Sequence, residues 1–182
     1  MSTVSQTPAA PAWSFRRRFA LGMGVVALIL AATVGTHIRG IADEALQARI
    51  HAPDLALFAR LPLAIKLHLV AALAGLLLGG VLMSVRKGRT FHRTAGWAWV
   101  GLVSLVAGSS LFITSLNHGR WSLLHLVTGW TLIILPLAVI WAKRHNIARH
   151  RRSMMGLFYG GFAINLLVAF IPGRILWTMI LG

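Results

Sequence analysis

The chain has 182 residues, of which 57% are hydrophobic, and it carries a formal net charge of +15. A soluble core of this size cannot bury so much apolar surface, so the composition indicates a membrane protein; the basic residues fall in short clusters between long uncharged stretches, which is a topology signal and not a nucleic-acid footprint. Cysteine is absent, which excludes disulfides, thiolate metal sites, iron–sulfur clusters and covalently attached c-type haem.

Five stretches free of Asp, Glu, Lys and Arg are long enough to cross a bilayer, which takes about 20 apolar residues. Because lipid offers no partner to backbone polar groups, each stretch is expected to be a helix. We therefore predict an all-α membrane protein with five transmembrane helices, in which a disordered cytoplasmic tail at 1–18 precedes a single transmembrane domain at 19–182. The predicted spans are about 19–38, 62–85, 92–116, 121–142 and 153–178.

Residues 39–61 form the only sizeable connection on the predicted outer face. Ile41, Ala45, Leu46 and Ile50 recur there near helical spacing, before Pro53 interrupts the pattern. This pattern predicts an interfacial helix that lies across the outer end of the molecule.

Lysine and arginine are divided unevenly between the two sides of this topology. Twelve of them lie in the N-terminal tail and in the second and fourth connections, without any acid, whereas the other six share the opposite side with all three acids. The positive-inside rule then predicts a bacterial cytoplasmic (inner) membrane protein with a cytoplasmic N-terminus and a periplasmic C-terminus. The acids are Asp43, Glu44 and Asp54.

An internal repeat relates the second and third spans to the fourth and fifth. Leu67-His68-Leu69-Val70 and Leu124-His125-Leu126-Val127 each open a span, and His92-Arg93 and His150-Arg151 follow after 24 and 25 residues (92 − 68 and 150 − 125). Helices 2–5 are therefore predicted to form a four-helix bundle built from a duplicated helix pair, with the first helix outside it.

The four repeated histidines fall at two depths, since consecutive helices run in opposite directions. His68 and His125 are expected near the outer surface, and His92 and His150 near the inner one, about 20 Å away by the helical rise. Two imidazoles from facing helices suit axial ligation of b-type haem, so each pair is a candidate metal and cofactor site, for up to two haems in all.

Other residues fit the same hypothesis. Gly96 and Gly129 lie four residues after His92 and His125 and would let a flat macrocycle approach the helix. Arg93 and Arg151 could pair with haem propionates. Arg174, which follows Pro172-Gly173, is a candidate anion clamp near the outer histidines.

The main alternative is a membrane scaffold, assembly factor or lipid-binding protein without enzymatic activity, in which the histidines are simply interfacial. No nucleophile–base set, phosphate loop or paired carboxylate is visible, so no catalytic residue is assigned. No charged residue lies deep in a predicted span, where an ion-coupled transporter would need one. The lipid bilayer is the expected surrounding; a quinone, a redox partner protein or a second copy of the chain are candidate partners, and nucleic acid is not.

A family resemblance covers about residues 62–174. It rests on Lys66-Leu67-His68-Leu69-Val70, Phe91-His92-Arg93-Thr94-Ala95-Gly96, Leu124-His125-Leu126, Arg149-His150-Arg151-Arg152-Ser153-Met154, Tyr159-Gly160-Gly161 and Pro172-Gly173-Arg174. In these motifs the chain resembles a large bacterial family of multi-pass membrane proteins whose function is unknown, and this resemblance implies no activity.

A second resemblance is one of layout. With one histidine on each of four successive helices, the chain is similar to the two-haem transmembrane b-type cytochromes, which move electrons from ascorbate or quinol. The resemblance implies that His68 pairs with His125 and His92 with His150, and it implies an electron-transfer function. The electron donor and acceptor do not follow from it.

Overall fold

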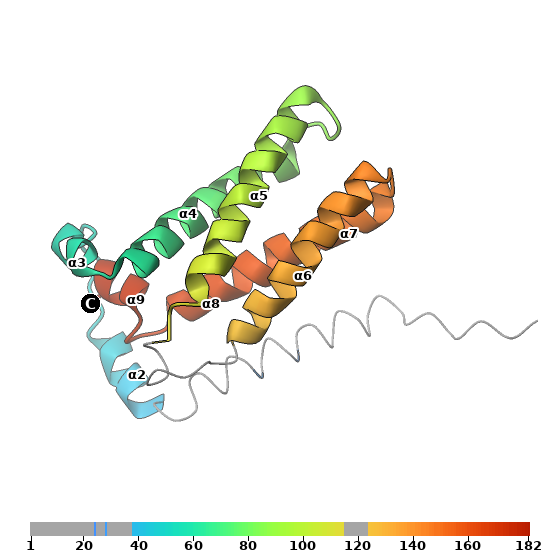
Figure 1. Cartoon of the computed structure of the whole chain (residues 1–182). Coiled ribbons are helices and arrows are strands. Elements are labelled where there is room, and N and C mark those ends of the chain that lie inside the picture. The colour runs from blue at the N-terminus through green and yellow to red at the C-terminus, as the bar shows by residue number, and fades with distance from the viewer. Residues whose placement is uncertain (1–23, 25–27, 29–37, 115–123) are drawn as a thin grey trace, which may run out of the picture. The chain divides into compact units, whose positions relative to one another are not determined.

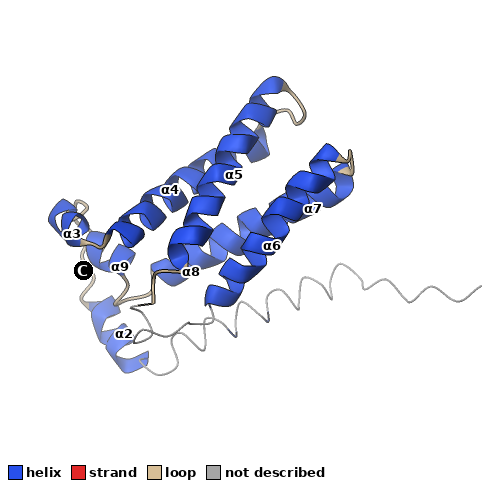
Figure 2. Cartoon of the chain, viewed as in Figure 1, coloured by secondary structure: helices blue, strands red, loops and turns tan. Residues whose placement is uncertain are grey.

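The computed structural model describes residues 38–114 and 124–182, together with Gly24 and Leu28. The predicted tail at 1–18 lies outside these residues, and so does the first predicted span apart from Gly24, Leu28 and Ile38. The described part consists of helices joined by turns and loops, with no strand within it (Figure 2). Residues 38–182 belong to one compact unit.

The chain runs from two short helices, Ile38–Leu46 and Leu55–Arg60, into four long helical stretches (Figure 1). The last long stretch is continuous from Ile147 to Ala169, although its middle has the wider π-helical winding. In chain order they are α2 (Ile38–Leu46), α3 (Leu55–Arg60), α4 (Leu63–Ser84), α5 (Thr90–Ser110), α6 (Leu124–Lys143), α7 (Ile147–Gly156), η2 (Leu157–Ala163), α8 (Ile164–Ala169) and α9 (Ile175–Ile180).

Three of the described helical stretches are long and apolar enough to cross a membrane: Leu63–Ser84, Leu124–Lys143 and Ile147–Ala169. The 22 residues of α4 extend over roughly 33 Å at the usual helical rise, which is enough for the hydrocarbon core of a bilayer. Leu77, Leu126 and Ile133 are among many large apolar side chains that these helices leave exposed. Because it is unfavourable to expose such large apolar surfaces to water, the structure indicates a membrane protein.

Helix α5 coincides with the third predicted span but is less apolar than the other three. It has 21 residues, yet His92, Arg93 and several glycines and serines lower its hydropathy. It ends at Ser110, earlier than the predicted 116.

Each of the four long helical stretches packs against two others. Helix α4 packs against α5 and η2, and α6 packs against α5, α7 and η2. Helices α4 and α6 begin at the end where α2, α3 and α9 gather, which we call the capped end, and α5 and α7 begin at the opposite end (Figure 1).

We call that opposite end the basic end, because the α4–α5 and α6–α7 connections and the first turns of α5 and α7 carry nine exposed basic side chains. These are Arg86, Lys87, Arg89, Arg93, Lys143, Arg144, Arg149, Arg151 and Arg152.

Two glycines of α4 allow the closest helix contacts. A Cβ atom at Gly75 would come 2.9 Å from the Phe162 ring, and one at Gly79 would come 2.5 Å from the Phe158 ring and 2.7 Å from Trp99 Nε1. The absence of side chains at these two positions therefore lets an aromatic cluster of Trp99, Phe158 and Phe162 fill the middle of the structure. Leu82, Val103, Leu135 and Leu157 complete this core.

At the capped end, the segment between α2 and α3 is held by the C-terminal residues. The backbone N–H of Arg49, His51 and Asp54 donate to the carbonyls of Leu181 (3.0 Å), Ile180 (3.1 Å) and Met179 (3.0 Å). The predicted interfacial helix is therefore present only over α2. Beyond Leu46 the chain satisfies its backbone by pairing with the C-terminus instead.

The region of the fifth predicted span, 153–178, is divided differently from the prediction. The helix begins earlier, at Ile147, where the Asn146 side chain accepts a hydrogen bond from the Arg149 N–H and caps it. It ends at Ala169, and α9 starts only at Ile175. Gly173 has a φ of +82°, a left-handed conformation that glycine adopts without steric cost, and this turn places Arg174 at the start of α9.

Candidate functional site

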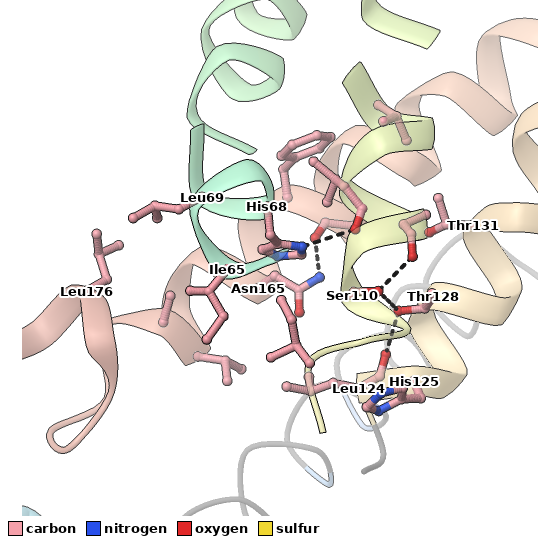
Figure 3. A pocket seen from close by; sticks show the side chains of 18 of the residues that line it. Ile65, His68, Leu69, Ser110, Leu124, His125, Thr128, Thr131, Asn165 and Leu176 are labelled. Carbon is pink, nitrogen blue, oxygen red and sulfur yellow. Dashed lines mark hydrogen bonds between the residues drawn. The ribbon is translucent and has the colours of Figure 1, made fainter. Parts of the chain in front are cut away.

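A cavity of about 220 Å³ opens between the long helices near the capped end (Figure 3). Its walls are mostly apolar. Three of the predicted site residues, His68, His125 and Arg174, line it together although they come from α4, α6 and the start of α9. The other polar residues that line it are Ser110, Thr128, Thr131 and Asn165.

The His68 ring is oriented by α5. Its Nδ1 lies 3.0 Å from the Val106 carbonyl oxygen and 3.2 Å from Ser109 Oγ. Because a carbonyl can only accept a hydrogen bond, Nδ1 carries the proton, and Nε2 is left with its lone pair as acceptor or metal ligand. The partly buried imidazole is thus fixed in one tautomer and one orientation.

His125 lies at another part of the same cavity. It is the second residue of α6, beside a hydrogen bond of 2.7 Å that joins Ser110 Oγ on α5 to Thr128 Oγ1 on α6. Figure 3 shows the His68 and His125 rings well apart from each other. The two side chains therefore line the same cavity. Their rings do not face each other directly, although the sequence predicted that they would.

Asn165, on the last long stretch, and Arg174, directly before α9, add polar groups to the cavity. The Asn165 side-chain amide donates to the Gly161 carbonyl within its own stretch, so it does not form the interhelical bond that a midspan asparagine suggests. That bond leaves its carbonyl oxygen as the atom available to a ligand. Arg174 is half-buried at the cavity wall. Its guanidinium is always charged and can only donate hydrogen bonds.

His92 and His150 lie together at the basic end. Nδ1 of His150 donates to the Ala138 carbonyl at 2.9 Å, so this ring, like that of His68, keeps its Nε2 lone pair. His92 is within electrostatic range of His150. Its Nδ1 is buried and has no hydrogen-bond partner among the described residues, which is a costly arrangement unless a ligand or water completes it.

The remaining predicted site residues lie as follows. Gly96 and Gly129 both have open space where a Cβ would stand, in contrast to the crowded Gly75 and Gly79. Arg93 and Arg151 are exposed at the basic end and directly follow His92 and His150 in the sequence.

The described residues contain no group of three or more His, Cys, Asp or Glu side chains that could hold a metal ion. A bare ion would need such a group, since zinc, for example, takes at least three protein ligands. Haem differs, because the macrocycle itself supplies the equatorial nitrogens and the protein adds only axial ligands. The two histidine pairs are thus poorly suited to a free ion, whereas the haem hypothesis requires only two imidazoles at each site.

Sequence reasoning missed the hydroxyl groups of this cavity. Ser110, Thr128 and Thr131 line the cavity, and Ser109 contacts His68 beside it. All four fall in apolar stretches, where small hydroxyl residues usually bond to their own helix. A usable signal was the position of Thr128 one turn after His125, on the same face of the helix.

Comparisons with protein-family models, with curated proteins and with solved structures gave no match for this chain. The two resemblances stated from the sequence therefore stay predictions, and the functional argument depends on the geometry of the histidines.

Proposed function

We propose that this chain is a membrane electron-transfer protein that binds b-type haem at two bis-histidine sites, His68 with His125 at the capped end and His92 with His150 at the basic end. The observation that carries the proposal is that one histidine of each pair donates its Nδ1–H to a backbone carbonyl, Val106 for His68 and Ala138 for His150. Metal-ligating histidines characteristically make this bond, which orients the ring and raises the basicity of Nε2.

The packing order supports the four-helix bundle of the proposal. Because α4 and α6 each contact both α5 and η2, we place α4 diagonally opposite α6, and α5 diagonally opposite α7. Each histidine pair then comes from a diagonal pair of helices and can approach the bundle axis from two sides. Diagonal helices leave space between them that a flat group could occupy, as cofactors do in other bundles.

The outer cavity is a partial fit for the macrocycle. Its volume of about 220 Å³ is below the range of about 300–1,000 Å³ for sites of drug-sized ligands, so haem entry requires α4 and α6 to move apart. Gly96 and Gly129 have open space at their Cβ positions, but neither lines this cavity. Arg174 at the outer site, and Arg93 and Arg151 at the inner one, would hold the propionates.

When bound, haem supplies a one-electron couple in each leaflet. The protein's part is to fix the imidazoles and to exclude water with the apolar walls of the cavity, two factors that set the reduction potential of the iron. The aromatic cluster of Trp99, Phe158 and Phe162 lies between the two histidine levels and keeps the sites separate. A quinone or a redox protein would be the exchange partner at the membrane surface.

The charge distribution orients the protein in this proposal. All nine basic residues of the basic end lie on one side, whereas Asp43, Glu44 and Asp54 lie at the capped end. By the positive-inside rule the basic end faces the cytoplasm of a bacterial inner membrane.

A visible absorption spectrum tests the haem proposal. The full chain is expressed with ample haem supply, purified in a mild detergent and recorded in oxidised and reduced states. We expect a Soret band and the sharp reduced bands of a low-spin b-type centre, with more than one haem per chain. A preparation that shows no Soret band overturns the proposal and leaves the scaffold or lipid-binding hypothesis, in which the carbonyl-bonded imidazoles only tie helices together.

A further inference from the structure

The basic end carries far more positive charge than the rest of the molecule can balance. Arg86, Lys87 and Arg89 occupy the α4–α5 connection, and Arg144, Arg149 and Arg152 surround the α6–α7 connection; all are exposed. The chain has only three acids. Asp54 caps α3 through Leu57 N–H, and Asp43 and Glu44 lie in α2, so all three are at the capped end. The anions that neutralise the basic end must therefore come from outside the chain.

The basic end is an ordered surface. Asn146 caps the start of α7, and Lys87 Nζ donates to the Met83 carbonyl at 2.6 Å, which completes the end of α4. Lys143 Nζ lies 5.6 Å from the centre of the Trp97 ring and so joins α6 to α5. Ordered cations lose less side-chain entropy when they bind an anion than cations on free loops do.

The aromatic residues place this surface at headgroup depth. Trp97 is 58% exposed, and Trp141 lies near the end of α6 at the same end of the structure. Tryptophan is enriched where hydrocarbon meets headgroups. The cations just beyond these rings consequently lie level with lipid phosphates and not in free solution.

We propose that the basic end is a binding surface for anionic phospholipids, whose phosphodiester groups lie between the α4–α5 and α6–α7 connections. Clusters of Lys and Arg at the ends of membrane helices bind anionic headgroups through charge and hydrogen bonds. The lipid site does not depend on the residues proposed to hold haem. It is argued without Arg93 and Arg151, which were assigned to the haem propionates. It holds whether or not the protein binds haem.

The test uses the full chain in a non-ionic detergent, titrated with short-chain phosphatidylglycerol or phosphatidylcholine, with bound lipid counted by native mass spectrometry. We expect phosphatidylglycerol to half-saturate the protein at a concentration about tenfold or more below that of phosphatidylcholine, since each nearby cation favours the anionic lipid. Replacing Arg86, Arg89, Arg149 and Arg152 with Gln should remove this preference, and raising the salt concentration should weaken it.

Two control variants separate charge from folding. Lys at the same four positions keeps the charge and should keep the preference. The pair Arg49→Gln and Arg60→Gln removes exposed charge from the capped end and should leave lipid binding unchanged. Equal binding of the two lipids, a preference that survives the four Gln substitutions, or an equal loss in the capped-end control would each overturn the proposal. So would complete competition by inorganic phosphate at the lipid's own concentration, because a lipid site also requires the acyl chains.

Discussion

The indole N–H of Trp99 on α5 donates a hydrogen bond of 2.9 Å to the Gly75 carbonyl on α4. The bond is possible because α4 presents no side chain at Gly75 or Gly79, so the indole can reach the backbone of the facing helix. The donor is buried, and in a lipid environment it would otherwise lack a partner. This contact fixes the register of α4 against α5, and thereby the position of His68 relative to the Val106 carbonyl.

Replacing Gly79 with Ala should destabilise the protein. The new Cβ would come 2.5 Å from the Phe158 ring and 2.7 Å from Trp99 Nε1, so the aromatic cluster must shift, at a cost of about 1–3 kcal/mol. The measurement is the free energy of unfolding in mixed detergent micelles. Gly80→Ala is the matched control, because nothing lies within 4 Å of its Cβ position. Equal stability of the two variants would contradict the close packing of Gly79 against the aromatic cluster.

Replacing Ser110 with Ala should weaken the contact between α5 and α6 beside the cavity. The substitution removes the 2.7 Å bond to Thr128 Oγ1, and its expected cost is about 0.5–1.5 kcal/mol. Thermal unfolding monitored by circular dichroism gives the comparison. Ser84→Ala serves as the control, because Ser84 Oγ is exposed and bonds only to Gly80 of its own helix. A larger loss in the control would contradict the assignment.

The two proposed haem sites should be separable by mutation. His68→Ala or His125→Ala should remove the outer haem alone, and His92→Ala or His150→Ala the inner one, since the aromatic cluster lies between the levels and the pairs are about 20 Å apart by helical rise. Haem content per chain and reduced-minus-oxidised spectra are the measurements. Loss of both haems in every variant would indicate a single site or global unfolding, and circular dichroism would distinguish these two.

Reporter fusions check the orientation. Fusions placed at Gly88 in the α4–α5 connection and at the N-terminus should report the cytoplasm, and a fusion at Gly182 should report the periplasm, because the basic end holds nine cations without an acid. A cytoplasmic Gly182 would remove one span from the five-span topology and reverse the assignment of the histidine levels.

The sequence by itself predicted where the described long helices lie, closely for 62–85 and less closely for 153–178, and at which end of each helix the repeated histidines fall. Uncharged stretches of sufficient length can satisfy their backbone in lipid only as helices, so the predicted span 62–85 is close to the observed α4, Leu63–Ser84. Alternating helix direction then placed His68 and His125 at one end, and His92 and His150 at the other. Proline and a glycine of positive φ end helices by local chemistry, so an interruption at Pro172-Gly173 follows from the sequence, although the predicted span 153–178 ran past it and the helix already ends at Ala169.

Only the tertiary structure decided how each helix is rotated about its axis and what it meets there. Gly75, Gly79 and Gly80 are chemically identical, yet the first two face an aromatic cluster and the third faces open space. The carbonyl partners of His68 and His150, the Ser110–Thr128 bond and the pairing of Arg49 with Leu181 join residues that no local pattern relates. These contacts depend on which helix faces pack together, and that choice is set by the summed contacts of the whole assembly.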